Sequence, residues 1–152
     1  MKTFRALVVD DEPLARIAVI SLIADYPSIE VAGEAGDADQ AARLIEEHKP
    51  DLLFLDIQMP GKTGFDLLNE VNFRGSVIFV TAYDEYALRA FEINALDYLM
   101  KPISPKRLKL SIERLDSDEE PRSEIPYSLN YNDRLFLLVG RNMIFLKISS
   151  IV

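Results

Sequence analysis

Apolar positions between residues 5 and 115 follow two alternating patterns. Segments typical of strands occur at residues 5–10, 29–35, 52–56, 76–81 and 97–101, and the apolar runs at 5–10 and 52–56 are expected to be buried on both faces of a sheet. Helical spacing of apolar residues follows each segment and predicts helices over residues 13–26, 37–47, 64–72, 84–91 and 104–115. Strands that alternate with helices over short turns predict an α/β fold with a doubly wound, five-stranded parallel sheet.

Local signals indicate where several of these helices begin. Pro13 suits a first helical turn, because its missing N–H would have no partner there. Either Asp37 or Asp39 is expected to cap the second helix, and Asp84 is expected to cap the fourth. In the first helix the side chains expected to face the core are those of Leu14, Ile17, Ala18 and Leu22.

The composition changes after residue 115. Residues 116–126 are acidic and rich in helix-breaking residues, which is typical of a linker. Residues 127–152 favour strands, and the apolar segments 135–139 and 143–148 flank Gly-Arg-Asn in a hairpin pattern. So short a segment does not make a stable domain by itself. We therefore expect one domain over residues 1–115, an acidic linker over 116–126, and the start of a second, truncated domain over 127–152.

Composition and charge narrow the classes of function. The chain has 152 residues and no cysteine, which excludes disulfides and thiolate metal sites. A formal net charge of −8 argues against a domain that grips nucleic acid by itself. No apolar stretch approaches the roughly 20 residues that span a bilayer. These features favour a cytoplasmic protein without a membrane segment.

The residues best suited to bind a ligand or take part in a reaction stand at the carboxyl ends of the expected strands. They are Asp10 and Asp11 after the first strand, Asp56 after the third, Thr81 after the fourth and Lys101 after the fifth. In an open parallel sheet these ends line the crevice in which ligands bind. Clustered carboxylates repel one another unless a cation lies among them, and oxygen ligands with an open coordination sphere suit Mg²⁺. The sequence therefore predicts a Mg²⁺ site beside Asp56.

Other kinds of chemistry have little support. His48 is the only histidine, and it lies late in a polar helix, which disfavours a catalytic triad or a histidine metal site. The segment 33–36 lacks the Gly-x-Gly turn of a dinucleotide-binding loop. A phosphatase with an aspartyl nucleophile of the haloacid-dehalogenase type needs a second acid two residues after Asp56, and Gln58 stands there. The missing acid favours a switch over a turnover enzyme.

These motifs, in this order, resemble the receiver domain of two-component response regulators. The resemblance covers roughly residues 3–115 and rests on Asp10-Asp11, Asp56-Ile-Gln-Met-Pro-Gly, Thr81-Ala82 and Lys101-Pro102. It implies a flavodoxin-like sheet with strand order 2-1-3-4-5 and a cis Lys101–Pro102 bond. It also implies a sensor histidine kinase as partner.

The resemblance also implies a role for each residue of the site. Asp56 would accept the phosphoryl group, and Thr81 and Lys101 would contact it. Mg²⁺ would be held by Asp11, Asp56 and the backbone carbonyl of Gln58, with Asp10 acting through water. Tyr98 would be the aromatic residue that changes rotamer on activation.

Two further resemblances concern the output. Residues 86–102 resemble the receivers of LytTR-type regulators (the LytR/AlgR-like subfamily), whose output domain is mostly β and binds DNA. Residues 134–152 resemble the opening strands of that domain. The alternative is a receiver that acts through protein–protein contacts or feeds an enzymatic output.

A homodimer on phosphorylation is a further expectation. The surface expected to form it comprises the helix that starts near Asp84, the strand that ends at Lys101 and the last helix. Leu88 and Phe91 would supply most of the affinity, and Arg89 and Glu92 would form ion pairs between subunits.

Overall fold

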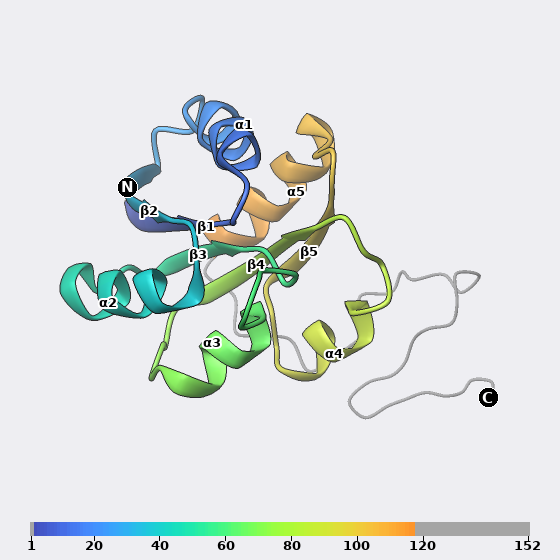
Figure 1. Cartoon of the computed structure of the whole chain (residues 1–152). Coiled ribbons are helices and arrows are strands. Elements are labelled where there is room, and N and C mark those ends of the chain that lie inside the picture. Colours follow the sequence, from blue (N-terminus) through green and yellow to red (C-terminus); the bar gives the residue numbers. More distant parts are fainter. Residues whose placement is uncertain (1, 118–152) are drawn as a thin grey trace.

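The computed structural model describes residues 2–117, which form a central five-stranded sheet with helices on both faces (Figure 1). The strands are β1 (Phe4–Val9), β2 (Ile29–Ala35), β3 (Leu52–Leu55), β4 (Ser76–Thr81) and β5 (Asp97–Met100). All neighbouring pairs are parallel and the spatial order is β2-β1-β3-β4-β5. This confirms the flavodoxin-like, doubly wound sheet that the sequence predicts.

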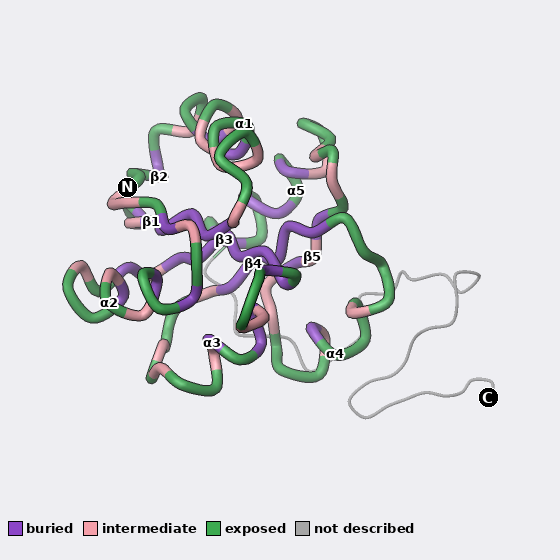
Figure 2. The backbone as a smooth tube through the Cα atoms, in the orientation of Figure 1, coloured by how far each residue is buried: buried purple, intermediate pink, exposed green. Residues whose placement is uncertain are grey.

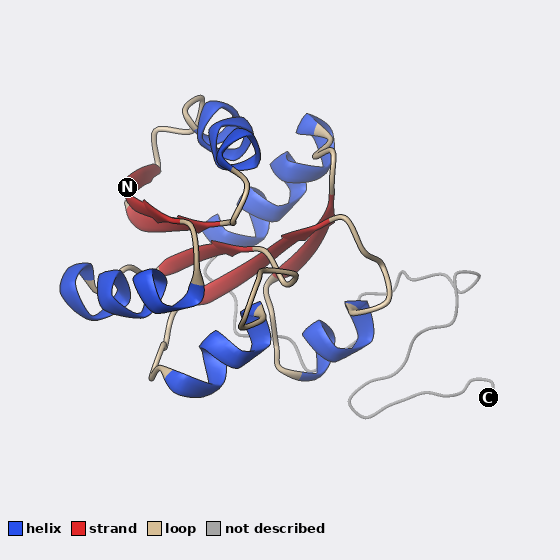
Figure 3. Cartoon of the chain, viewed as in Figure 1, coloured by secondary structure: helices blue, strands red, loops and turns tan. Residues whose placement is uncertain are grey.

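Five helices cover the sheet in two layers (Figure 3). One face carries α1 (Pro13–Ile23) and α5 (Pro105–Asp116). The other face carries α2 (Ala38–His48), α3 (Gly64–Glu70) and α4 (Ala87–Glu92). Each layer closes over its own apolar cluster, and the strands β1, β3 and β4 between the two clusters are the most completely buried elements (Figure 2). The central strand β3 is buried at all four positions, as its continuous apolar run predicts.

The face that α1 turns toward the sheet differs from the prediction. Val19 and Ile23 are buried and Leu22 packs against the core as predicted, whereas Leu14 is 79% exposed, Ile17 is 56% exposed and Ala18 is also exposed. The prediction was wrong for these three residues because α1 carries apolar residues around most of its circumference, so the sequence offers several apolar faces. Packing against β1 and α5 selects the one with Val19 and Ile23.

Helix starts follow the sequence signals in part. Pro13 occupies the first turn of α1, and the Asp37 carboxylate accepts a hydrogen bond from the Gln40 backbone N–H at 2.7 Å, so Asp37 is the cap of α2. The prediction for Asp84 was wrong. Tyr86 stands at the N-cap of α4 without a side-chain cap, and Asp84 contributes only its backbone carbonyl to the turn before it.

Three remaining predictions have different outcomes. The Lys101–Pro102 bond is cis, as the resemblance implies. The β-rich segment 127–152 and its hairpin lie outside the described residues, as does most of the linker. No helix within residues 2–117 is long and apolar enough to cross a bilayer.

Candidate functional site

Asp10, Asp11 and Asp56 converge at the carboxyl edge of the sheet, as the sequence predicts. The Asp56 backbone N–H donates to the Val9 carbonyl at 2.9 Å, which fixes the residue directly after β3 to the end of β1. One carboxylate oxygen from each of the three acids lies within 4.8 Å of the other two. Asp10 and Asp56 are only 2% and 4% exposed, so two of the three charges lie out of contact with bulk water.

Lys101 reaches this cluster from the loop after β5. Its Nζ lies 2.9 Å from a carboxylate oxygen of Asp10 and 3.2 Å from one of Asp56. The exposed Glu12 carboxylate is farther away, at 3.6 Å. Burial lowers the pKa of Lys101, but the contacts with Asp10 and Asp56 outweigh that effect and raise it, so the ammonium stays charged.

The charges of the cluster do not balance. Burial is the main cause that raises the pKa of Asp56, repulsion by Asp10 adds to it, and Lys101 compensates only in part. Three carboxylates thus face one ammonium group in a space 4.8 Å across. An oxygen-only donor set with excess negative charge fits a hard divalent cation such as Mg²⁺. The residues present therefore fit the metal that the sequence predicts.

Thr81 ends β4 and Tyr98 lies on β5, and both contact the loop that follows β4. Thr81 is fully buried, and its hydroxyl accepts a hydrogen bond from the Tyr83 backbone N–H at 3.4 Å. The Tyr98 hydroxyl donates to the Tyr83 carbonyl. Burial raises the pKa of Tyr98 to about 12, so this hydroxyl remains a donor throughout the physiological range. Both side chains are thereby tied to the same residue of the β4–α4 loop.

The loop from β3 to α3 wraps closely around Asp56. The Gln58 backbone N–H approaches the Asp56 Oδ1 at 3.3 Å. Gly64, which opens α3, packs against the backbone of Asp56 so tightly that a Cβ on it would lie 2.5 Å from the Asp56 carbonyl oxygen. Gly64 is therefore required for the close approach of α3 to the site.

Arg16 is a residue of the site that the sequence analysis missed. Its Nη1 donates to the Asp10 backbone carbonyl at 2.5 Å, and its Nε donates to Glu34 Oε1 on β2 at 2.8 Å. The side chain is only 18% exposed, so α1 holds the acidic turn in place through a nearly buried guanidinium. The only signal in the sequence is that Arg16 is the single charged residue of a largely apolar helix.

Asp97 is a second residue that the sequence analysis missed. This buried acid opens β5 and accepts two hydrogen bonds from Arg107 of α5, at 2.6 and 2.7 Å. Arg114 approaches at 3.4 Å, and the Ser111 hydroxyl also donates to it. Burial alone would raise the pKa of Asp97, but these partners together hold it below its usual value. The cluster fixes α5 to β5.

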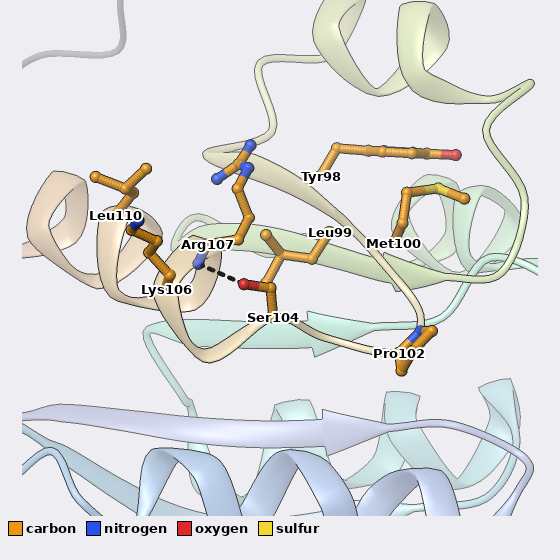
Figure 4. Close-up of a pocket in the computed structure, with 8 residues that line it drawn as sticks. All are labelled: Tyr98, Leu99, Met100, Pro102, Ser104, Lys106, Arg107 and Leu110. Carbon is orange, nitrogen blue, oxygen red and sulfur yellow. Dashed lines mark hydrogen bonds between the residues drawn. The ribbon is translucent and has the colours of Figure 1, made fainter.

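A groove of about 490 Å³ lies between β5 and α5, away from the acidic cluster (Figure 4). It is lined by Tyr98, Leu99, Met100, Pro102, Ser104, Lys106, Arg107 and Leu110. Met100 and Leu110 are 41% and 51% exposed. On the neighbouring α4, Leu88 is exposed, but the Arg89 guanidinium lies over the Phe65 ring, 4.1 Å from its centroid. Arg89 thus already has a partner within the chain.

Comparison with known proteins identifies the class. A family model described as "Response regulator receiver domain" matches residues 6–113. The chain therefore belongs to the response regulator receiver family. Among solved structures, a two-component response regulator of the LuxR family from Aurantimonas superposes with a TM-score of 0.69 at 31% identity, over 76% of this chain and 86% of that one.

Curated relatives include several regulators. An uncharacterized response regulatory protein of Vibrio vulnificus is 49% identical over 72% of this chain and 46% of its own length. The transcriptional regulatory protein BtsR of Salmonella typhimurium is 44% identical over 73% of this chain and 47% of its own. The sensory transduction protein LytT of Enterococcus faecalis is 34% identical over 94% of this chain and 64% of its own. The chain spans about half the length of the first two.

Proposed function

We propose that this receiver domain is a phosphorylation switch in which Asp56 accepts a phosphoryl group in the presence of Mg²⁺. One observation carries the proposal. The buried Asp56 carboxylate lies 3.2 Å from the Lys101 ammonium and shares a 4.8 Å cluster with two further carboxylates. That arrangement provides a nucleophile, a fixed positive charge and a set of oxygen ligands at one edge of the sheet.

The proposed transfer is a displacement at phosphorus. An Asp56 carboxylate oxygen forms a bond to phosphorus while the bond to the leaving group, a kinase histidine nitrogen or the acyl oxygen of a small phosphodonor, breaks. Lys101 and the Thr81 hydroxyl then contact the phosphoryl oxygens. Asp11, Asp56 and the Gln58 backbone carbonyl would ligate the metal, with Asp10 acting through water. When bound, Mg²⁺ supplies charge neutralisation at the phosphoryl oxygens.

The proposed product is a phosphorylated domain in which the phosphoryl group stays on Asp56 rather than being released at once as phosphate. Gln58 supplies no acid or base two residues after Asp56, so hydrolysis of the acyl phosphate is expected to be slow. Two of the relatives named above are named as regulatory proteins and the third as a sensory transduction protein, which agrees with a domain that catalyses only its own phosphorylation and slow dephosphorylation.

The proposed switch runs from Thr81 to Tyr98. On phosphorylation the Thr81 hydroxyl would turn to the phosphoryl group and give up its contact with Tyr83. The Tyr98 ring, released from the Tyr83 carbonyl, would then turn into the vacated space. Because Tyr98 lines the groove between β5 and α5, its rotation would change the surface on which a homodimer would form.

The proposed output is transcription control through a LytTR-type DNA-binding domain. The partial match to BtsR and the longer match to LytT support this, together with the composition change after residue 115. In this proposal residues 1–115 are the receiver, 116–126 the linker and 127–152 the opening of the output domain. A cytoplasmic sensor histidine kinase pathway would supply the phosphoryl group.

Mass spectrometry of the chain after treatment with acetyl phosphate tests the proposed function. We expect one added phosphoryl group that requires Mg²⁺ and is absent from Asp56→Ala. Asp25→Asn, which removes an exposed carboxylate just after the C-terminal end of α1, is the matched control and should behave like the wild type. An unchanged adduct yield in Asp56→Ala would disprove the assignment of the phosphoacceptor.

A further inference from the structure

The groove between β5 and α5, which we call the β5–α5 groove, combines apolar and cationic side chains (Figure 4). Its volume is about 490 Å³, and the exposed apolar side chains of Met100 and Leu110 line it from the two elements. Lys106 and Arg107 line it from α5. A segment that fits this groove should therefore carry acidic side chains together with apolar ones.

The wall that α5 forms is positively charged, although the chain as a whole is acidic. α5 carries four cationic residues and two acidic ones, whereas the formal net charge of the chain is −8. Arg107 gives two hydrogen bonds to Asp97, which leaves three of its five guanidinium N–H groups open to another acceptor. No carboxylate among residues 2–117 pairs with Lys106. The described part of the chain therefore does not neutralise this wall.

The segment that follows α5 has the chemistry that the groove requires. Residues 118–126 lie outside the described residues, and their sequence is Asp-Glu-Glu-Pro-Arg-Ser-Glu-Ile-Pro. It contains four acidic residues and one arginine, and it ends in two apolar residues. The acidic side chains match the cationic wall, and the apolar end matches the exposed Met100.

The length of the segment also fits the groove. α5 ends at Asp116, and Lys106 lies eleven residues before Ser117, which is about 17 Å along the helix at about 1.5 Å per residue. An extended chain covers about 3.3 Å per residue, so it returns over that distance in about five residues. A turn of about two residues after Ser117 then brings Glu124 level with Lys106.

We propose that residues 118–126 bind in the β5–α5 groove of their own chain. Glu124 pairs there with Lys106, and the apolar end of the segment packs against Met100. Bound in this way, the segment covers part of the surface expected to form the homodimer, so it competes with a second copy of the chain. The competition rests on the proposed function, because it concerns the homodimer on phosphorylation, whereas the binding of the segment does not.

Paramagnetic broadening of amide resonances in the unphosphorylated 152-residue chain tests the binding. The chain has no cysteine, so Ser123→Cys provides a single site for a nitroxide label. We expect the label to broaden the amide resonances of Met100 and Arg107, but not that of Ile45, which lies on α2 against the other face of the sheet. In a mixture of nitroxide-labelled chains and isotope-labelled chains without nitroxide, we expect no broadening, because the contact lies within one chain.

A charge exchange tests the proposed ion pair. Lys106→Glu should lower the ratio of bound to free segment by about fivefold, which is the effect of about one exposed ion pair, and adding Glu124→Lys should restore it. Lys109→Glu is the matched control, because Lys109 is an exposed lysine of the same helix that does not line the groove. Three results would each overturn the proposal: no broadening of Met100, equal losses in Lys106→Glu and Lys109→Glu, or broadening that arises only between chains.

Sedimentation with beryllofluoride and Mg²⁺ tests the competition. Glu124→Lys should strengthen dimerisation by about two- to tenfold, because it weakens the competing contact by about one ion pair. Glu47→Lys makes the same charge change at an exposed position on α2 and should have less effect. Equal strengthening in both variants would disprove the competition. If Asp56 took up no phosphoryl group, the proposed function would fail, while broadening in the unphosphorylated chain would still show the bound segment.

Discussion

At the scale of single residues, two cationic side chains hold the carboxylates of the acidic site in place. Lys101 is the ammonium that contacts Asp10 and Asp56, and Arg16 holds the Asp10 backbone from the other side. Residue types at strand ends made Asp10, Asp56 and Lys101 predictable from the sequence. Arg16 was not predictable, because its role depends on the conformation of its side chain, which reaches back from α1 to the Asp10 carbonyl in the preceding turn.

Arg16 is expected to set the affinity of the site for Mg²⁺. Arg16→Met removes the donor to the Asp10 carbonyl and frees the turn that carries Asp10 and Asp11. A charge-assisted hydrogen bond contributes about 1.5–3 kcal/mol, and part of it is recovered from water, so we expect Mg²⁺ binding to weaken by about tenfold. Calorimetric titration with Mg²⁺ measures this.

The matched control for that titration is Arg43→Met, which removes an exposed arginine on α2. Both variants lose one positive charge, so a purely long-range electrostatic effect would strengthen Mg²⁺ binding in each. Equal affinities in Arg16→Met and the wild type would show that Arg16 does not position the acidic turn.

At the scale of elements, the strands β1, β3 and β4 were predictable because burial on both faces leaves apolar runs in the sequence. The exposed face of α1 was not, because Leu14 and Ile17 have the same apolar character as Val19 and Ile23, and only packing decides between them. The short α4 was also hard to place, since Tyr86 begins it without the side-chain cap that Asp84 was expected to provide.

The attachment of α5 to β5 predicts a dependence of stability on pH. The folded state lowers the pKa of Asp97 below its ordinary value of 3.8, so the folded state binds fewer protons than the unfolded chain as pH falls through that range. The stabilisation is fully present above that ordinary value and is lost as the pH falls through the lower, folded pKa.

Asp97→Asn tests this attachment. The variant leaves Arg107 and Arg114 without their carboxylate, and because both are partly exposed we expect a loss of about 1–3 kcal/mol at neutral pH. Urea unfolding at several pH values should show the difference from the wild type shrinking in acid. Asp25→Asn, at an exposed acid after α1, is the control, and a difference independent of pH would contradict the account.

At the scale of the whole molecule, the surface of α4, β5 and α5 is where phosphorylation of Asp56 would change binding to a second copy of the chain. Leu88, Met100 and Leu110 are 60%, 41% and 51% exposed there. The Arg89 guanidinium already packs on the Phe65 ring, so apolar contacts rather than ion pairs would supply most of the affinity between two copies of the chain.

Sedimentation of the chain with and without beryllofluoride and Mg²⁺ tests the homodimer. We expect a shift toward dimer only with both additions, and its loss in Leu88→Glu. Leu14→Glu makes the same change at the 79% exposed position on α1 and should still dimerise. An identical monomer under both conditions would disprove the homodimer while leaving the role of Asp56 intact.

The central claim, that Asp56 carries the phosphoryl group, is tested most directly by locating the bond itself. Borohydride reduces an aspartyl phosphate to homoserine, and peptide sequencing by mass spectrometry then identifies the modified position. After acetyl phosphate treatment with Mg²⁺, the account predicts homoserine at position 56 and none when Mg²⁺ is chelated. Homoserine at another aspartate, or at position 56 in equal yield without Mg²⁺, would contradict it.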